Sequence, residues 1–135
     1  MTLEVSLTPD ALRGETLAAA CGKGLAGSWV EFTGLVRREE AGQPIAALEY
    51  EAYPGMAEAQ MKRILTELGQ QYPCLSARVI HRVGLIPVGE AAIYVGIASV
   101  HRQEGFALLA EFMNRLKQDV PIWKVRAIPS SQRAD

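Results

Sequence analysis

Hydrophobic and polar residues alternate with period two in some segments and recur with helical spacing in others. Alternation or a short apolar run predicts strands over residues 3–7, 29–37, 45–52, 77–82, 91–99 and 122–128. Apolar residues at helical spacing, with capping and proline signals at the ends, predict helices over residues 9–20, 56–72 and 104–119. The order β-α-β-β-α-β-β-α-β predicts an α+β fold with a mixed or antiparallel sheet and about three helices.

The strand over residues 91–99 is apolar at nearly every position, which is typical of a strand covered on both faces. We therefore expect this strand to be central in its sheet. Residues 84–89 contain two glycines and a proline and predict a turn, and the polar residues 39–44 predict a mobile loop. In the second helix, the predicted buried positions are Met56, Met61, Ile64, Leu65, Leu68 and Tyr72.

The final helix carries a lysine on its apolar face. A helical projection places on one face Phe106, Leu109, Phe112, Met113 and Leu116. Lys117 belongs to the same face, one turn beyond Met113, so its ammonium must reach solvent at the helix end or face a cleft. Pro121 cannot continue a helix, so this helix should end by Asp119.

A second lysine lies on the strand that follows this helix. Alternation over residues 122–128 places Lys124 and Arg126 on one face with Ile122. The short proline turn between helix and strand can therefore bring Lys117 and Lys124 to one cleft. The competing interpretation is two solvated surface lysines, which is the commoner situation for an arbitrary pair.

Composition limits the classes of function. The 135 residues are 49% hydrophobic and carry a net charge of −1, which suits one domain, residues 1–135, and gives no global attraction to nucleic acid or anionic membranes. Cys21 and Cys74 lie far apart and neither has a neighbouring histidine, so the sequence indicates no metal site and no bound cofactor. The first ten residues lack a signal-peptide pattern and no apolar run reaches membrane length, so we expect a cytoplasmic location.

Known nucleotide and hydrolase motifs are absent, but several cations stand at the ends of predicted elements. The glycine-rich residues 22–27 lack the terminal Lys-Ser/Thr of a phosphate-binding loop, and no G-x-S-x-G occurs. His81 lies mid-strand, where a structural role is the commoner one. His101 and Arg102 stand at the predicted start of the final helix, where free N–H groups favour anions. Arg37, Arg102, Lys117, Lys124 and Arg126 together outline a basic cleft suited to an anionic substrate.

Several blocks of the sequence resemble the catalytic, MoaE-type large subunit of molybdopterin synthase. The resemblance covers roughly residues 28–129 and rests on GLVR at 34–37, EYEAYPGM at 49–56, IHRVG at 80–84, VGE at 88–90, SVHR at 99–102, LK at 116–117 and PIWK at 121–124. The family commonly carries an acidic residue two positions after the second lysine, where this chain has Arg126.

The resemblance implies a fold, a reaction and a set of partners. The implied fold is an α/β hammerhead-type domain that forms a homodimer and, with two small ubiquitin-like subunits, a heterotetramer. The Gly-Gly tail of each small subunit ends in a thiocarboxylate, whose sulfur passes to cyclic pyranopterin monophosphate to form the dithiolene of molybdopterin. By motif position, the resemblance implies active-site roles for Lys117 and Lys124, and substrate binding by Arg37, His101, Arg102 and Met113.

Two other functions remain open at the level of sequence. One is a binding module that docks the ubiquitin-like partner without turnover, and the other is a domain that binds a small phosphorylated anion. Arg126 belongs to the predicted substrate-binding set because alternation places it beside Lys124.

Overall fold

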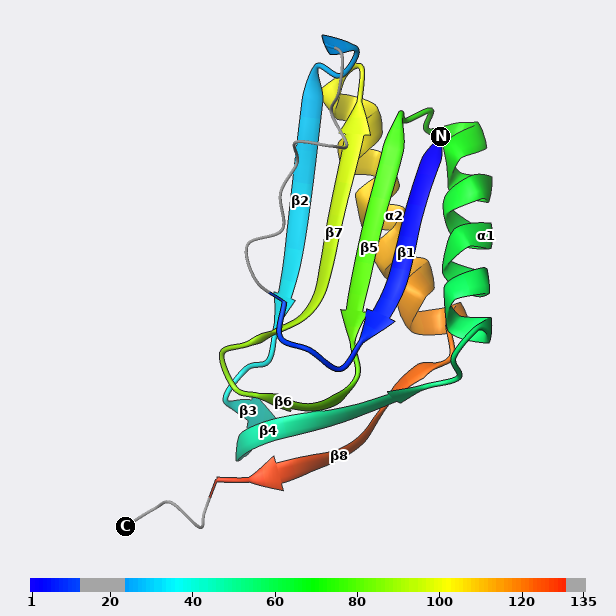
Figure 1. The fold of residues 1–135 in the computed structure, drawn as a ribbon. Coiled ribbons are helices and arrows are strands. Elements are labelled where there is room, and N and C mark those ends of the chain that lie inside the picture. The colour runs from blue at the N-terminus through cyan, green and yellow to red at the C-terminus, as the bar shows by residue number, and fades with distance from the viewer. Residues whose placement is uncertain (13–23, 131–135) are drawn as a thin grey trace.

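The computed structural model describes residues 1–12 and 24–130. The elements of these residues are, in order, β1 (Thr2–Thr8), β2 (Ser28–Leu35), β3 (Glu39–Glu40), β4 (Gln43–Ala52), α1 (Met56–Gln71), β5 (Ser76–Arg82), β6 (Gly84–Pro87), β7 (Ala91–Ser99), α2 (Arg102–Asp119) and β8 (Ile122–Pro129) (Figure 1). The expected α+β class is confirmed. The helix expected over residues 9–20 falls mostly in residues 13–23, which lie outside the described part of the chain.

The larger sheet has the strand order β1-β5-β7-β2, with β1 and β5 parallel and the other pairs antiparallel. Strand β7 therefore lies inside the sheet, as its apolar sequence predicts. Helices α1 and α2 lie side by side on one face of this sheet (Figure 1). The β7 side chains are buried along most of the strand, which explains why the sequence of this strand shows no alternation.

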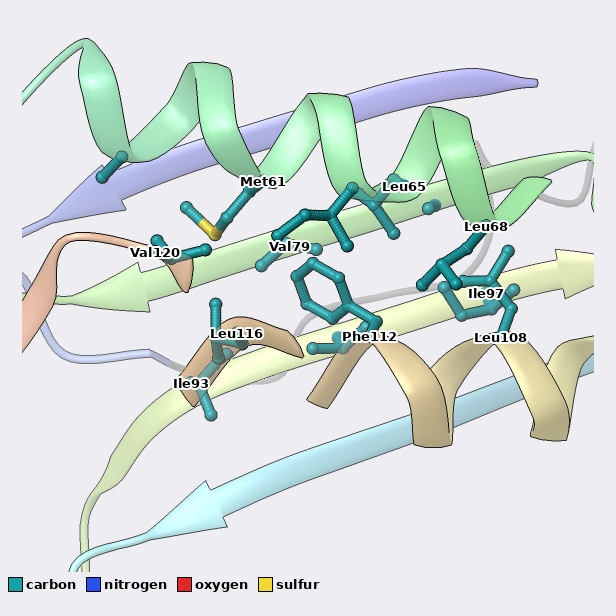
Figure 2. Packing of buried hydrophobic residues seen from close by; sticks show 14 residues of the cluster. Met61, Leu65, Leu68, Val79, Ile93, Ile97, Leu108, Phe112, Leu116 and Val120 are labelled. Atoms are coloured by element: carbon teal, nitrogen blue, oxygen red, sulfur yellow. The ribbon is translucent and has the colours of Figure 1, made fainter. Parts of the chain in front are cut away.

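The main core fills the space between the two helices and the larger sheet. Figure 2 shows Phe112 of α2 beside Val79 of β5 and below Leu65 of α1. Phe112 is fully buried, and the cluster also contains Met61, Ile64, Leu68, Val95, Ile97, Leu108 and Leu116. Burial of apolar surface at about 25 cal/mol per Å² is the main contribution that holds α2 against the sheet.

Strand β4 is the centre of a second, smaller group of strands. It pairs antiparallel with β3, β6 and β8. The expected turn at residues 84–89 is wrong in part, because β6 occupies Gly84–Pro87 and buries Ile86 completely. The expected mobile loop at residues 39–44 is also wrong, because β3 and β4 form a tight hairpin. Ala41 and Gly42 both have positive φ, as two-residue hairpin turns require.

The buried face of α2 is rotated from the face that helical projection predicts. Its buried residues are Gly105, Leu108, Phe112 and Leu116, whereas Phe106 is 57% exposed and Lys117 is exposed. Gly105 explains the rotation, because a Cβ there would meet Ser99 Oγ at 3.0 Å, so the helix approaches β7 closely on this side. Similarly, Met56 of α1 is exposed and Ala57 is buried instead. The predicted end of α2 at Asp119 is confirmed.

Neither α1 nor α2 is long and apolar enough to cross a membrane, within the described residues.

Candidate functional site

A cleft of about 460 Å³ lies where the larger sheet, the strands around β4 and the end of α2 meet. We call it the lysine cleft. Its polar and aromatic lining comprises Arg37, Glu40, Tyr50, His81, Lys117, Trp123 and Lys124, and its apolar lining includes Phe32, Leu35, Met113, Leu116 and Ile122. The two lysines predicted to converge therefore line one cleft, together with the predicted residues Arg37 and Met113.

Lys117 reaches the lysine cleft from the last turn of α2. The side chain is exposed, and Leu116 beside it is buried in the core, so the helix end is held while the lysine remains accessible. Pro121 ends the helix, and Val120 N–H donates to Leu116 O at 3.3 Å. Lys117 forms no ion pair with any residue in the described ranges.

Lys124 enters the cleft from the start of β8, opposite Tyr50 of β4. Its Nζ donates to Glu40 Oε2 at 2.7 Å, which joins β8 to the β3–β4 hairpin. The pKa of Tyr50 is raised above its ordinary value, first by burial, while the charge of Lys124 lowers it and that of Glu40 raises it. The charges of Lys124 and Glu40 therefore have opposite effects on the pKa of Tyr50, which lines the same cleft.

A β-bulge separates Arg126 from Lys124. Glu49 pairs with Arg126 and Tyr50 pairs with Lys124, so Val125 has no partner on β4. Neighbouring residues of β4 face opposite sides, so the expected placement of Lys124 and Arg126 on one face is wrong. Arg126 Nε instead donates to Glu49 Oε1 at 2.6 Å, and Arg126 is not part of the cleft lining. Its part in substrate binding stays a prediction.

Arg37 follows the end of β2 and is exposed at the cleft. The neighbouring Val36 is buried and holds this segment by two backbone hydrogen bonds, from its N–H to Glu90 O at 3.0 Å and from Gly89 N–H to its oxygen at 2.8 Å. Val36 therefore fixes the backbone from which the arginine projects. Arg37 and Lys117 leave two cations in the cleft without a carboxylate partner among the described residues.

His81 is a buried histidine at the edge of the lysine cleft. Its Nδ1 lies 2.7 Å from Arg82 O, a contact that the ring makes as a donor, and its ring meets Tyr50 edge-on at 5.4 Å between centroids. Burial lowers the pKa of His81 below its ordinary value, although the backbone hydrogen bond opposes this effect. The imidazole is thus kept neutral beside the two lysines. The hydrogen bond to Arg82 O is compatible with the structural role that the sequence predicts for His81. The sequence did not predict that His81 also lines the lysine cleft.

His101 and Arg102 lie at the other end of α2. His101 is the N-cap residue, and Ser99 Oγ donates to its backbone oxygen at 2.6 Å. Both residues line a second pocket of about 870 Å³, with Trp29, Glu31 and Phe106 also in the wall. Lys117 lies sixteen positions after His101, or about 24 Å along the helix at 1.5 Å per residue. Within one copy of the chain, this pair and the lysines therefore do not share a site.

The described residues contain no group of three or more histidines, cysteines or carboxylates that could hold a metal ion. The chemistry available in the lysine cleft is that of two amines, a guanidinium, a carboxylate, a phenol and a neutral imidazole. These groups can bind an anion and transfer protons.

Comparison with known proteins decides the family. Residues 7–119 match the family model described as MoaE protein. The chain belongs to the MoaE family. Among curated MoaE relatives, the molybdopterin synthase catalytic subunits of Homo sapiens and Escherichia coli (strain K12) are 38% and 37% identical over 74% and 79% of this chain. The chain spans about half of the human relative (53%) and 71% of the Escherichia coli one.

Solved structures show the same fold. Molybdopterin synthase from Staphylococcus aureus matches with a TM-score of 0.83 and 29% identity, over 92% of this chain and 90% of that one. A complex of subunits 1 and 2 of the molybdopterin-converting factor from Helicobacter pylori matches with a TM-score of 0.74 over 96% of this chain and 91% of that one. At 19% identity, that match supports the fold alone.

Four residues of the polar and aromatic cleft lining in this MoaE-family chain escape prediction from the sequence as site residues, namely Glu40, Tyr50, His81 and Trp123. The sequence around Glu40 predicts a polar loop. In the structure this segment is a hairpin, with positive φ at Ala41 and Gly42, and it lies beside β8. Tyr50 and His81 lie on strands that meet only in the tertiary fold. The one available signal was that His81 lies mid-strand among apolar residues, which more often indicates a structural role.

Proposed function

We propose that this protein is the catalytic subunit of a molybdopterin synthase. In this proposal it transfers sulfur from the C-terminal thiocarboxylate of a small ubiquitin-like subunit to cyclic pyranopterin monophosphate. The observation that carries the proposal is the convergence of Lys117 and Lys124 on one cleft with Arg37. Membership of the MoaE family and the names of its curated relatives support the same reaction.

Lys117 is proposed to act on the thiocarboxyl carbon. Attack of the thiocarboxylate sulfur on a carbon of the pterin precursor forms a carbon–sulfur bond, breaks the carbon–oxygen bond at that carbon and leaves the sulfur linked to the acyl carbon of the partner. The departing oxygen leaves as water or as the freed phosphate oxygen, with a lysine ammonium of the cleft as the proton source. Breaking that acyl–sulfur bond requires a nucleophile, either the Lys117 amine or a water deprotonated by it, and leaves the sulfur on the precursor. Lys117 suits this role because it is accessible and carries no carboxylate partner among the described residues.

Lys124 and Arg37 are proposed to hold the precursor and stabilise negative charge that develops during transfer. Met113 lies one turn before Lys117 in the same lining and would contact the precursor through its apolar side chain. Arg126 would support this site from outside the cleft through its ion pair with Glu49.

His101 and Arg102 are proposed to complete the site of a second copy, with which this chain forms a homodimer. The separation of about 24 Å along α2 requires this arrangement if both pairs bind one substrate. The strand β2 lies at the end of its sheet and carries the exposed apolar residues Phe32 and Leu35. Val100 and Phe106, near the start of α2, are exposed as well. A second copy would cover this edge and this apolar surface.

The small ubiquitin-like subunit is proposed to insert its Gly-Gly tail into the lysine cleft. Glycines suit such a tail because residues without side chains fit a narrow passage beside Lys117. Trp123 lines the cleft, and its ring lies 5.6 Å from that of Tyr53, so two exposed aromatic residues stand where a partner can dock. The Helicobacter pylori structure shows a related fold in a complex of two subunits.

Reconstitution tests the proposal. The purified chain, the thiocarboxylated small subunit and cyclic pyranopterin monophosphate should form molybdopterin, detected as its fluorescent oxidation product. A small subunit that ends in an ordinary carboxylate is the matched control and should give none. Tight binding of the small subunit without product would instead favour the non-catalytic binding module.

A further inference from the structure

Glu40 places a negative charge inside a cleft that otherwise collects cations. Its Oε2 accepts a hydrogen bond from Lys124 Nζ at 2.7 Å, and both side chains line the lysine cleft. We propose that Glu40 is an exchangeable counter-ion, which competes with the anionic group of the substrate for Lys124. The inference rests on the proposed function only for the identity of that anion, the cyclic phosphate of the precursor.

The hairpin holds the backbone of Glu40 in place. Glu40 pairs with Gln43, and Ile45 N–H donates to Arg38 O at 2.9 Å just outside the turn. The turn residues Ala41 and Gly42 have φ of 52° and 79°, a conformation in which glycine is favoured. The carboxylate is therefore presented to β8 from a defined position, 84 residues away in sequence from Lys124.

The side chains of this ion pair can separate at low cost. They are 45% exposed for Lys124 and 28% exposed for Glu40, and ion pairs with such access to water contribute little stability. Two further cations of the cleft, Arg37 and Lys117, have no carboxylate partner among the described residues. An anion that enters can therefore contact both of these cations and also take the place of Glu40 at Lys124.

Exchange at Lys124 makes Glu40 a residue that determines affinity. With the carboxylate present, a bound phosphate must break an existing charge-assisted hydrogen bond and remain near a like charge. Removing the charge should therefore tighten anion binding. A positioning role would give the opposite result, because Lys124 would lose the group that orients it.

The test compares Glu40→Gln with Glu39→Gln, its neighbour in β3. Glu39 is exposed, lies outside the cleft lining, and loses the same charge on substitution. Inorganic phosphate is titrated into the purified full-length protein, in whichever oligomeric state it adopts, at low ionic strength. The heat of binding is measured by calorimetry. We expect Glu40→Gln to bind phosphate about fivefold more tightly than wild type and Glu39→Gln to change little.

Each other result overturns the inference. Equal tightening in both variants would indicate general electrostatics, and unchanged or weaker binding in Glu40→Gln would indicate no exchange. If neither wild type nor Glu40→Gln bound phosphate, the lysine cleft would not be an anion site. Matching thermal unfolding curves verify that both variants fold.

The titration needs neither partner nor turnover, so it is independent of the proposed reaction. If reconstitution gives no molybdopterin while Glu40→Gln still gains phosphate affinity, the proposed function fails and the inference stands. If reconstitution succeeds, Glu40→Gln should also lower the apparent KM for the precursor.

Discussion

Arg126 and Glu49 form an ion pair of 2.6 Å across the ladder between β8 and β4, one position from the bulge at Val125. Glu49 lies next to Tyr50, so this pair and the Tyr50–Lys124 pair face opposite sides of the same strands. The bulge therefore assigns Lys124 to the lysine cleft and Arg126 to the outer face.

We expect Arg126→Ala to raise the KM for the precursor less than Arg37→Ala does, because only Arg37 lines the cleft. The cost in unfolding free energy should be at most about 1 kcal/mol, since the Arg126 side chain is 63% exposed. Steady-state kinetics and denaturant unfolding measure both effects. If Arg126→Ala raised the KM more than Arg37→Ala does, this would indicate that Arg126 contacts the precursor.

Lys117→Ala should reduce the rate of molybdopterin formation by about 10²- to 10⁴-fold, because a positioned proton-transfer or nucleophilic group is lost. Lys124→Ala should be severely but less completely impaired, because Lys124 binds and stabilises charge. Single-turnover product analysis measures both rates. Thermal unfolding should stay close to wild type, since Lys117 is exposed. Near wild-type turnover of Lys117→Ala would contradict the proposed mechanism.

Mixed dimers test whether His101 and Arg102 serve the site of a second copy. Lys117→Ala and Arg102→Ala should each be impaired alone, but one site of a mixed dimer would contain an intact Lys117 and an intact Arg102. Random mixing at equal amounts should restore about a quarter of the wild-type activity. Mixing Lys117→Ala with Lys124→Ala is the control and should restore none, because both residues belong to the same copy. Equal results in both mixtures would exclude a shared site.

Acid should destabilise the protein through His81. The pKa of His81 is lowered in the folded state by burial, so the unfolded chain binds the proton more readily. This loss of stability is absent above the ordinary histidine pKa of about 6.5 and grows as pH falls below it. The decline in Tm from pH 7 to pH 5 should be shallower in His81→Gln, whatever its absolute Tm. His101→Gln, at an exposed position, should keep the wild-type slope.

Gly96→Ala should destabilise the larger sheet. A Cβ at Gly96 would overlap Trp29 Cζ2 and lie 2.7 Å from Trp29 Cη2 and 2.9 Å from the Tyr94 hydroxyl. Overpacking of this kind costs about 1–3 kcal/mol in unfolding free energy. Gly69→Ala in α1 is the control, because its Cβ would meet only the flexible end of Met1 and alanine favours a helix. Denaturant unfolding should show a loss for the first variant and none for the second.

The sequence by itself determined the elements that rest on local physics. Pro121 cannot continue a helix, so α2 ends at Asp119, and the apolar run of β7 can be stable only inside a sheet. The helix–proline–strand order also predicted that Lys117 and Lys124 can reach one cleft, because few residues separate them, but it left two solvated surface lysines as the alternative until the tertiary structure placed both in the lining.

Only the tertiary structure decided which side chains from distant strands meet. The bulge at Val125 depends on the register between β8 and β4, and a shift of one residue changes the face of everything beyond it. Glu40 meets Lys124, and Tyr50 meets His81, by side-chain contacts between strands that do not pair with each other, and alternation along one strand does not specify such contacts. The length of α2 sets His101 apart from Lys117, because a rigid helix converts sequence separation into distance.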